Sequence, residues 1–545
     1  MTEAGTEVSG EREAVRVARA AGIIGAATLL SRVLGLVREI VVTRAFGATH
    51  AADAFFVAFR IPNLLRELLA EGSMSAAFVP VFSEYLAKRS RAEAVDLAHT
   101  IFTVLLILLS SATILGIVAA PWIVRVIAPG FGVEDKFDLT VTLARVMFPF
   151  LIFVGFAALA MGILNALRRF TVPALAPAVL NVGVISGVLF LPPYLDPPIL
   201  GLAIGELIGG LLQFAIQIPP LLKEKIAFRL RWRPRDPGLA QIRRLFLAFL
   251  VGAGALQINN FVLTILASYL AAGSVSYLYY GMRLIHLPLG VFGVAMATAI
   301  LPELSVQATR GEVGRLRETF ASGMSLVLLI TVPAAIGLVS FAGPIVSTIF
   351  MRGAFDAAAA HGTAQAVMAY AVGLWAFGAV RVAVAAFYSM RETRVPVAGT
   401  VVTVAANVIL SLLLMGPLEH AGLALATALA AVLNLGFLLY FLRRRLETVG
   451  GRRIAGAFLK AAAGSVPIGL VGVFLSRNAL WLVDGRLGEK AVWLALGTGA
   501  GLVSYGVLGD GAGNRAGCPA LPQARGCALG NNARPESLSP RERGG

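Results

Sequence analysis

The sequence predicts an all-α polytopic membrane protein with about fourteen transmembrane helices. Hydrophobic residues make up 58% of its 545 residues, charged residues make up only 14%, and the mean hydropathy is +0.81. A soluble domain of this length would be far less apolar. Apolar runs close to the roughly 20 residues needed to cross a bilayer recur along the whole chain. An internal repeat is the third observation, because it divides most of these runs into two matching sets.

Glycine, proline and charged residues mark where the apolar runs end, and this punctuation places the expected spans. The first 16 residues mix acidic and basic side chains. They do not resemble a secretory signal peptide, so the first span should remain in the mature protein. We expect spans near residues 17–46, 51–86, 95–128, 138–167, 173–194, 199–222, 241–272, 274–306, 316–350, 358–389, 395–416, 420–442, 455–476 and 488–508.

The repeat has a constant spacing. RRFTVP, ending at Pro173, recurs as RETRVP, ending at Pro396, and FFVAFR, ending at Arg60, is echoed by YYGMR, ending at Arg283. The difference in residue number is the same for both pairs, and we call it the repeat offset. Because six expected spans separate the copies, both halves should insert the same way round. This predicts two six-helix lobes related by a pseudo-two-fold axis along the membrane normal, with two extra C-terminal helices.

Basic residues are concentrated in alternate loops. If the N-terminus is cytoplasmic, the loops on that side carry about 23 lysine and arginine residues, against 6 on the other side. This bias predicts that both termini are cytoplasmic. The largest loop, 223–244, is interpreted as a topology signal and linker, with contact to anionic lipid or substrate head groups as the alternative. No basic domain stands apart from the apolar runs, so nucleic acid is not an expected partner.

The character of the chain changes after residue 509. The tail is rich in Gly, Pro and Arg without apolar periodicity, so we expect it to be disordered, or aberrant if the reading frame has shifted. The tail holds the only cysteines, Cys518 and Cys527, so no disulfide supports the core. The expected units are an N-terminal cytoplasmic segment (1–16), an N-lobe of helices 1–6 (17–222), a basic cytoplasmic linker (223–244), a C-lobe of helices 7–12 (245–445), helices 13–14 (446–509) and the tail (510–545).

Ionisable residues inside the expected spans are the candidates for function. A charge at the centre of a membrane helix costs about 2.5–3.5 kcal/mol on insertion scales, so it usually faces a partner or a wet cavity. Arginine presents a planar fork that matches phosphate or carboxylate oxygens. An anionic, phosphorylated substrate would suit several arginines around one cavity. The alternative is that they pair with Glu39, Asp53, Glu67 and Glu71 and only hold helices together. The arginines are Arg32, Arg38, Arg60, Arg66 and Arg283.

Signals for an enzyme are scarce. The five histidines are scattered, and the sequence has no His-Glu-x-x-His, no Walker loop and no carboxylate cluster of metal-binding spacing. A transporter or a channel without a cofactor therefore remains. With no ATP site, a transporter would be driven by an ion gradient or by the membrane potential. A membrane enzyme acting on polyprenyl-phosphate sugars is the alternative from another class. It would need a catalytic carboxylate or metal cluster that the sequence does not show.

Four stretches carry a family resemblance: SRVLGLVRE (31–39), DAFFVAFRIPNLLRELLAEGSMSAAFVP (53–80), GSVSYLYYGMRL (273–284) and FYSMRETRVPV (387–397). They resemble the MurJ/MviN lipid II flippases of the multidrug/oligosaccharidyl-lipid/polysaccharide exporter superfamily, and the similarity runs from about residue 18 to 508. The resemblance implies an inner-membrane protein of fourteen helices whose last pair forms a groove for a lipid tail. It implies alternating access that carries undecaprenyl-pyrophosphate-linked peptidoglycan precursor (lipid II) from the cytoplasmic to the periplasmic leaflet, in cell-wall biogenesis.

The resemblance also implies roles for single residues. The chain departs from better-known members at one point, because Met282 and His286 replace an acidic pair around Arg283, which argues against carboxylate-based coupling there. The expected partners are lipid II and membrane lipids, with the protein acting as a monomer beside the cell-wall synthesis machinery. A related exporter of another lipid-linked glycan or amphipathic compound is the alternative. We expect substrate binding at Arg32, Arg38, Arg66, Arg283, Asn63 and Ser276, and coupling or gating at Asp53, Glu71 and Arg60.

Overall fold

The protein is helical in the part of the chain that its computed structural model describes, residues 3–70, 73–132 and 134–513. Within these ranges no β-strand occurs, so the predicted all-α class is confirmed. A helix satisfies every backbone hydrogen bond within its own segment, which is what a lipid environment requires. The predicted tail lies outside the described residues from 514 onward, and with it lie both cysteines.

Some helices of the first half are long and single, and others are short and follow one another directly. Several predicted spans therefore consist of two consecutive helices, such as α5 with α6. The elements are α1 (Glu3–Phe46), α2 (His50–Ala70), α3 (Ser73–Lys88), α4 (Arg91–Ile127), α5 (Glu134–Met147), α6 (Phe150–Ala166), α7 (Thr171–Phe190), the 3-10 turn η1 (Pro192–Tyr194), α8 (Leu200–Ala215) and α9 (Ile218–Lys223).

The second half follows the same order, and a final group of helices is added after it. The elements are α10 (Pro237–Ser268), α11 (Ser274–Pro288), the π-helical turn η2 (Leu289–Gly293), α12 (Val294–Thr309), α13 (Val313–Ser340), α14 (Ala342–Phe350), α15 (Ala357–Ala371), α16 (Leu374–Ser389), α17 (Arg394–Leu446), α18 (Gly451–Gly464), α19 (Val466–Ser476), the 3-10 turn η3 (Ala479–Leu482) and α20 (Leu487–Gly513).

Every predicted span coincides with a helix or with consecutive helices. In the described residues, seven helical segments are long and apolar enough to cross a membrane, or eight if the bent pair of α15 and α16 is one span. Helix α17 is 53 residues long but breaks at Glu419, whose φ of 48° and ψ of −129° are not helical. It therefore holds two successive predicted spans. The count of fourteen crossings stays a prediction.

The repeat offset also holds along the helix ends. Helix α4 ends at Ile127 and α14 at Phe350, while α9 ends at Lys223 and α17 at Leu446. The turn after α6 and the turn after α16 each contain an arginine in the left-handed region, Arg168 with φ 59° and Arg391 with φ 57°. A residue in this conformation commonly ends a helix, although an arginine adopts the conformation less readily than a glycine does. The two halves thus share one architecture without insertions at these points.

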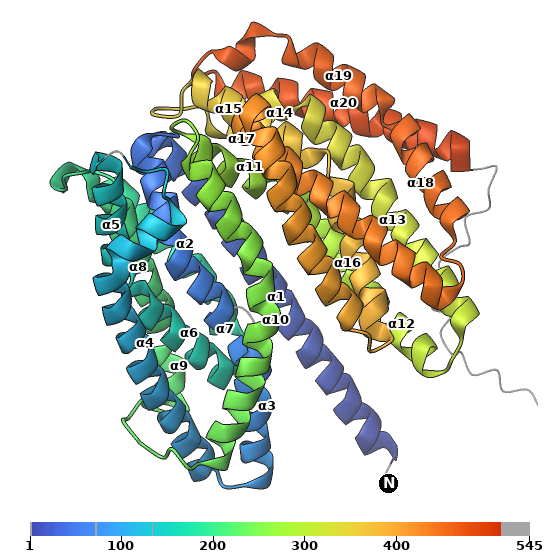
Figure 1. Ribbon diagram of the computed structural model, residues 1–545. Coiled ribbons are helices and arrows are strands. Elements are labelled where there is room, and N and C mark those ends of the chain that lie inside the picture. The colour runs from blue at the N-terminus through green and yellow to red at the C-terminus, as the bar shows by residue number, and fades with distance from the viewer. Residues whose placement is uncertain (1–2, 71–72, 133, 514–545) are drawn as a thin grey trace, which may run out of the picture.

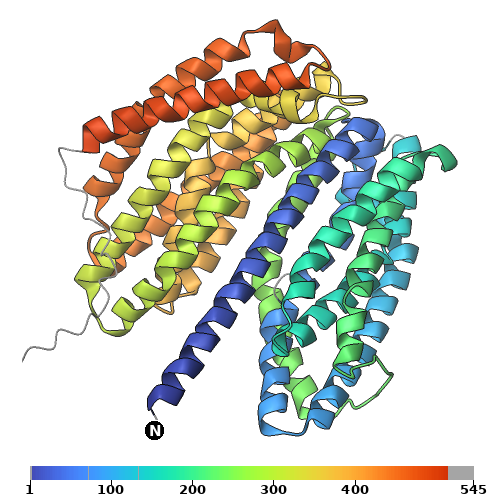
Figure 2. The ribbon, with the colours of Figure 1, turned by 180° about the vertical axis from the view of Figure 1, so that it is seen from behind.

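The two sets of helices meet at one end and separate toward the other. We call the end where α1 begins the basic end, because the loops that follow α6, α9 and α17 bring basic clusters there, and the opposite end the far end. Figures 1 and 2 show the sets close together at the far end and diverging toward the basic end, with α1 and α10 between them. One hydrophobic cluster joins both sets at the far end and includes Phe46 and Phe55 of the first half with Tyr280 and Phe350 of the second.

Ion pairs join separate loops at the basic end. Glu224 accepts hydrogen bonds from Arg91 Nη2 at 3.1 Å and from Arg169 Nε at 3.0 Å. These hydrogen bonds hold the pKa of the Glu224 carboxyl below its ordinary value. Glu447 is the repeat equivalent of Glu224, and it accepts from Arg317 Nη2 at 2.9 Å. Each set of helices is thus tied at the same point of the repeat. Helix α10 begins within the predicted linker and packs on α3 and α4.

Helices α7 and α8 touch backbone to backbone. A Cβ atom built on Gly187 would lie 2.3 Å from the Cα of Gly205, and one on Gly183 would lie 2.4 Å from the Cα of Gly209. Side chains are therefore excluded from this contact. Small residues that allow close approach are a main source of helix association in membranes.

Replacing Gly187 with alanine should destabilise the protein. The added methyl group has no space, and overpacking of this kind costs about 1–3 kcal/mol. We expect purified Gly187→Ala protein to unfold several degrees below wild type in a thermal melt in detergent. Gly436→Ala in α17 is the matched control, because nothing lies within 4 Å of its Cβ position. Equal melting temperatures for the two variants would contradict the close contact.

Candidate functional site

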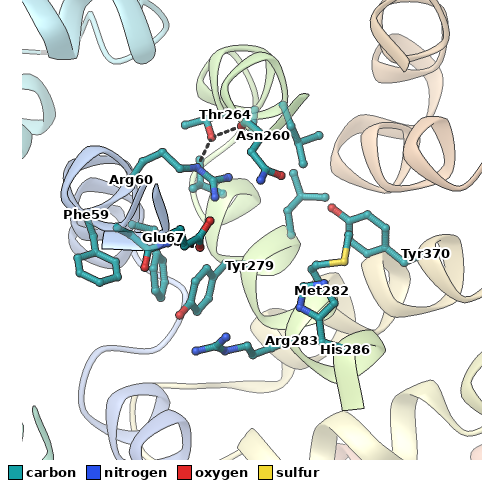
Figure 3. A pocket seen from close by; sticks show the side chains of 16 residues that line it. Phe59, Arg60, Glu67, Asn260, Thr264, Tyr279, Met282, Arg283, His286 and Tyr370 are labelled. Carbon is teal, nitrogen blue, oxygen red and sulfur yellow. Dashed lines mark hydrogen bonds between the residues drawn. The ribbon is translucent and has the colours of Figure 1, made fainter. Parts of the chain in front are cut away.

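A cavity lies where the two sets of helices face each other, between α2, α10, α11 and α15 (Figure 3). Its walls combine aromatic rings with ionisable and amide side chains, a mixture that can bind a ligand with both polar and apolar parts. The polar and aromatic lining residues are Phe56, Phe59, Arg60, Asn63, Glu67, Asn260, Thr264, Tyr279, Arg283, His286 and Tyr370.

This cavity lies on the pseudo-two-fold axis. Asp53 accepts hydrogen bonds from the backbone N and Oγ of Ser276, which is its own equivalent by the repeat offset. Phe56 stacks on its own repeat equivalent, Tyr279, with 4.0 Å between ring centroids and 22° between planes. Two residues related by a two-fold rotation can touch only close to the axis. The axis therefore passes between α2 and α11 at these two contacts.

Two further equivalent pairs continue along the cavity wall. Arg60 corresponds to Arg283, and Asn63 corresponds to His286, by the same repeat offset. Positions 53, 56, 60 and 63 are spaced by three or four residues, so they lie on one face of α2, and their equivalents lie on one face of α11. The cavity thus receives one arginine from each half of the repeat.

Both cavity arginines are anchored through Nε. Arg60 Nε donates to Thr264 Oγ1 at 3.0 Å, and Arg283 Nε donates to Glu39 Oε1 at 3.1 Å. Within the described part of the chain, the terminal nitrogens of these two guanidinium groups donate no hydrogen bond. In the view of Figure 3, the Glu67 carboxylate and the Tyr279 ring lie between these two guanidinium groups. Such forks are suited to bidentate binding of phosphate oxygens.

Glu39 of α1 links two arginines, one from each half of the chain. It is buried, with 5% of its surface exposed. It accepts from Arg38 Nη2 at 2.7 Å as well as from Arg283. Arg38 is largely buried as well. A buried carboxylate is stable in such a place only with partners of this kind. Glu39 therefore holds Arg283 in position and occupies part of its binding capacity.

Glu67 joins α2 to α10 in a similar way. One of its oxygens accepts from Asn63 Nδ2 at 2.8 Å, and the other accepts from Gln257 Nε2 at 2.7 Å. Asn63 in turn accepts from Arg66 Nε and Nη2 at 3.1 and 3.0 Å. The two turns of α2 nearest the basic end thus carry a connected polar network that reaches the cavity.

Asp53 closes the far end above the cavity. It is 1% exposed and accepts from Gly273 N at 2.7 Å in addition to Ser276. Lys136 Nζ of α5 lies 3.1 Å from the same carboxylate and 3.9 Å from the ring centroid of Phe131. The carboxylate therefore caps the N-terminus of α11, where the helix dipole favours a negative charge. One side chain of the first half thus fixes the position of a helix in the second.

The structure brings together only part of the predicted site. Asn63 and Arg283 line the cavity, as does Arg60, which we predicted for coupling or gating; Arg38 and Arg66 reach it through carboxylate and amide neighbours. Ser276 and Asp53 meet at the far end, away from the cavity wall. The guanidinium of Arg32 lies beside η2, because a Cβ built on Gly290 would be 3.7 Å from its Nη1. Glu71 lies outside the described residues.

Sequence reasoning missed several residues of the site. Lys136 completes the Asp53 contact, Tyr279 stacks in the cavity, and α10 contributes Gln257, Asn260 and Thr264. These three positions are spaced by three and four residues, a polar helix face that periodicity alone could have found. The repeat offset, applied to Phe56, would have identified Tyr279.

Comparison with known proteins gives a consistent result. The family model for "Lipid II flippase MurJ" matches residues 42–485. A probable lipid II flippase MurJ of Vibrio cholerae is 36% identical over 506 residues, covering 90% of this chain and 95% of that protein. The lipid II flippase MurJ of Burkholderia cenocepacia is 35% identical over 423 residues, covering 77% and 82%.

Solved structures agree with the sequence comparison. A lipid II flippase MurJ in an inward closed conformation aligns with a TM-score of 0.74 at 26% identity, covering 89% of this chain and 97% of that one. An inward-facing multidrug transporter of the MATE family aligns with a TM-score of 0.67 at 16% identity, covering 79% and 98%. The second likeness establishes the fold alone.

Removing the Asp53 carboxylate should loosen the far end. Asp53→Ala leaves buried donors and the Lys136 ammonium without their acceptor, and breaking such a buried pair costs about 3–5 kcal/mol. In a chain whose Cys518 and Cys527 are serine, we introduce a cysteine at Ala267, which lines the cavity toward the far end. This cysteine should react faster with an impermeant maleimide, added from the far-end side, in the Asp53→Ala background. Glu489→Ala, which removes an exposed carboxylate, is the control. Equal rates in the wild-type and Asp53→Ala backgrounds would show that the Asp53 contacts do not hold the far end closed.

Proposed function

The chain belongs to the MurJ family of lipid II flippases, and from this premise we propose that the cavity on the pseudo-two-fold axis binds the pyrophosphate of lipid II. Membership makes the protein a transporter and not an enzyme, a multi-pass protein of the bacterial inner membrane that flips lipid II by alternating access. We further propose which residues hold the substrate and how the lobes move.

The pairing of Arg60 with Arg283 is the observation that carries the proposal. Pyrophosphate consists of two phosphates joined by a bridging oxygen, so its own local symmetry is two-fold. Two guanidinium groups related by a two-fold axis can each take one phosphate with a bidentate hydrogen-bond pair. Both arginines are already oriented through Nε, so little side-chain freedom is lost on binding. Tyr279 and Phe56 form the apolar wall beside them.

Binding would exchange partners as well as add contacts. Glu39 holds Arg38 and Arg283, and a pyrophosphate would compete with this carboxylate for both. Arg66 and Asn63 would extend the site toward the basic end. Arg32 lies beside η2, next to Gly290. We expect these side chains to receive the head group first, before it reaches the pair on the axis.

The observed conformation fits one step of alternating access. We propose that the basic end is cytoplasmic, as the distribution of basic residues predicts. The two sets of helices diverge there and are latched at the far end by Asp53, so this state would receive substrate from the cytoplasm. Breaking the latch while the basic end closes would expose the head group to the periplasm.

We propose residues 17–222 and 245–445 as the two lobes and 223–244 as their cytoplasmic linker. Helices α19 and α20 present an apolar surface that includes Leu470, Phe474, Trp493 and Leu496, and this surface would hold the polyprenyl tail. The protein would act as a monomer, beside enzymes that polymerise the exported precursor.

Loss of either cavity arginine, Arg60 or Arg283, should abolish transport. Expressed in a bacterium depleted of its own lipid II flippase, wild type should restore growth and exposure of lipid II at the outer face. Arg283→Ala and Arg60→Ala should each fail, because each loses a charged contact that the bound pyrophosphate would bury, and losing such a contact costs about 2–5 kcal/mol. Arg283→Lys should rescue only in part, since a lysine keeps the charge but not the fork.

Arg477→Ala is the matched control, because this arginine is exposed at the far end, away from the cavity. All variants are first checked for insertion in the membrane fraction. Full rescue by Arg60→Ala and Arg283→Ala would contradict the proposed substrate site. Failure of inserted wild type would mean that this chain carries another lipid-linked glycan or an amphipathic compound.

A further inference from the structure

A buried carboxylate in the first half has no role in the arrangement described so far. Glu206 of α8 is 4% exposed. Within the described part of the chain it makes no hydrogen bond and no ion pair, whereas Glu39 and Glu67 each make several. An ionised carboxylate is costly in such a place unless it has partners. Glu206 therefore differs in kind from the other carboxylates near the cavity.

Its position on α8 explains this isolation. Gly205 and Gly209 turn one face of α8 toward α7, while a Cβ built on Gly210 would lie 2.8 Å from Phe150 of α6. Glu206 is one turn before Gly210, so it lies on the face toward α6. Neither α6 nor α7 carries an ionisable residue. These two helices thus offer the carboxylate no partner.

Other charged residues of the neighbouring elements are engaged elsewhere or exposed. In α5, Lys136 pairs with Asp53, and Arg145 donates to the Ile117 carbonyl oxygen. The remaining described charges of α5 and α9, those of Asp135, Asp138 and Lys223, are exposed. The charges that act on Glu206 come from Arg38, Arg66, Glu39 and Arg283. These are the groups that surround the proposed substrate site.

Two amide side chains continue this line toward the basic end, Gln213 within α8 and Gln217 just beyond its last residue. Positions 206, 210, 213 and 217 follow helical spacing. The buried Oε1 atoms of Gln213 and Gln217 accept no hydrogen bond from the described residues. Gln217 Nε2 donates to the Ala157 carbonyl oxygen, which fixes the direction of that amide. The stripe offers water two acceptors between Glu206 and the end of α8, in a region otherwise apolar.

We propose that Glu206 takes up a proton when the anionic substrate binds and releases it when the substrate leaves. This rests on the proposed function of the cavity. A pyrophosphate beside Arg38, Arg66 and Arg283 withdraws the positive charge that stabilises an ionised Glu206, and it adds repulsion of its own. The carboxylate then gains a proton from water at the basic end, along the stripe of Gln213 and Gln217, and returns it to water after release.

The sign of the pH dependence follows from this exchange. Proton uptake on binding means that substrate binds best at low pH, and that the affinity falls by up to about tenfold per pH unit where the proton is taken up. His286 lines the cavity and is itself a titratable group. Its contribution has the same sign, so it must be removed before Glu206 is assigned.

Calorimetry with a short-chain, water-soluble lipid II analogue tests the proposal. Full-length protein in nanodiscs is titrated between pH 5.5 and 8.5 in buffers of different ionisation enthalpy, which counts the protons taken up. In a His286→Gln background, uptake should persist and should vanish in His286→Gln/Glu206→Gln. The double variant should bind at pH 8.5 as tightly as at pH 5.5. Glu206→Asp should keep the dependence, because it keeps a titrating group.

Infrared spectroscopy gives a readout that does not need the substrate. A carbonyl band of a protonated carboxylic acid should change with pH in wild type and be absent from Glu206→Gln. Glu489→Gln, at an exposed carboxylate, should leave both readouts unchanged. Undiminished proton uptake in the double variant, or a pH-dependent band that survives Glu206→Gln, would overturn the proposal. If the band behaves as expected but wild type binds no analogue, the proposed substrate fails and the proton site stands.

Discussion

The carboxylate of Asp53 is the contact on which the arrangement of the two halves depends. It is a charge of the first half that caps a helix of the second, and it meets Ser276, its own counterpart in the repeat. A residue can touch its counterpart only on the symmetry axis. The contact therefore fixes where the axis runs. The stacked rings of Phe56 and Tyr279 and the two cavity arginines follow from it at successive turns of the same helices.

Away from water, each of these charges needs a partner in every state of the transport cycle. In the observed state Glu39 and Glu67 supply partners from the protein itself. An arriving anion replaces those partners, so only the difference between the two sets of contacts appears as affinity. This keeps a site with several arginines from holding a pyrophosphate too tightly to release it, which a transporter must avoid.

Much of the fold could be predicted from the sequence, because hydropathy, loop charge and the repeat offset can be taken from the order of residues alone. The same offset already related Arg60 to Arg283. The sequence named Glu39 among the possible carboxylate partners of the arginines, but not which arginine it pairs with, since its contact with Arg283 depends on how the halves tilt against each other. Glu206 carried a signal that was available, a single carboxylate within an apolar run. Its lack of a partner became visible only when α6 and α7 were placed around it.

The glycine contact between α7 and α8 gives the two halves different mechanical properties. A backbone surface has no side chains that can change rotamer, so these helices move as one stiff rod pair. The corresponding positions of the second half carry side chains that must interdigitate and can slide past one another. Elastic deformation during a cycle should concentrate in that half, with the first acting as the rigid lever. At the positions equivalent to Gly183, Gly187, Gly205 and Gly209, the second half has Ala406, Leu410, Ala428 and Val432.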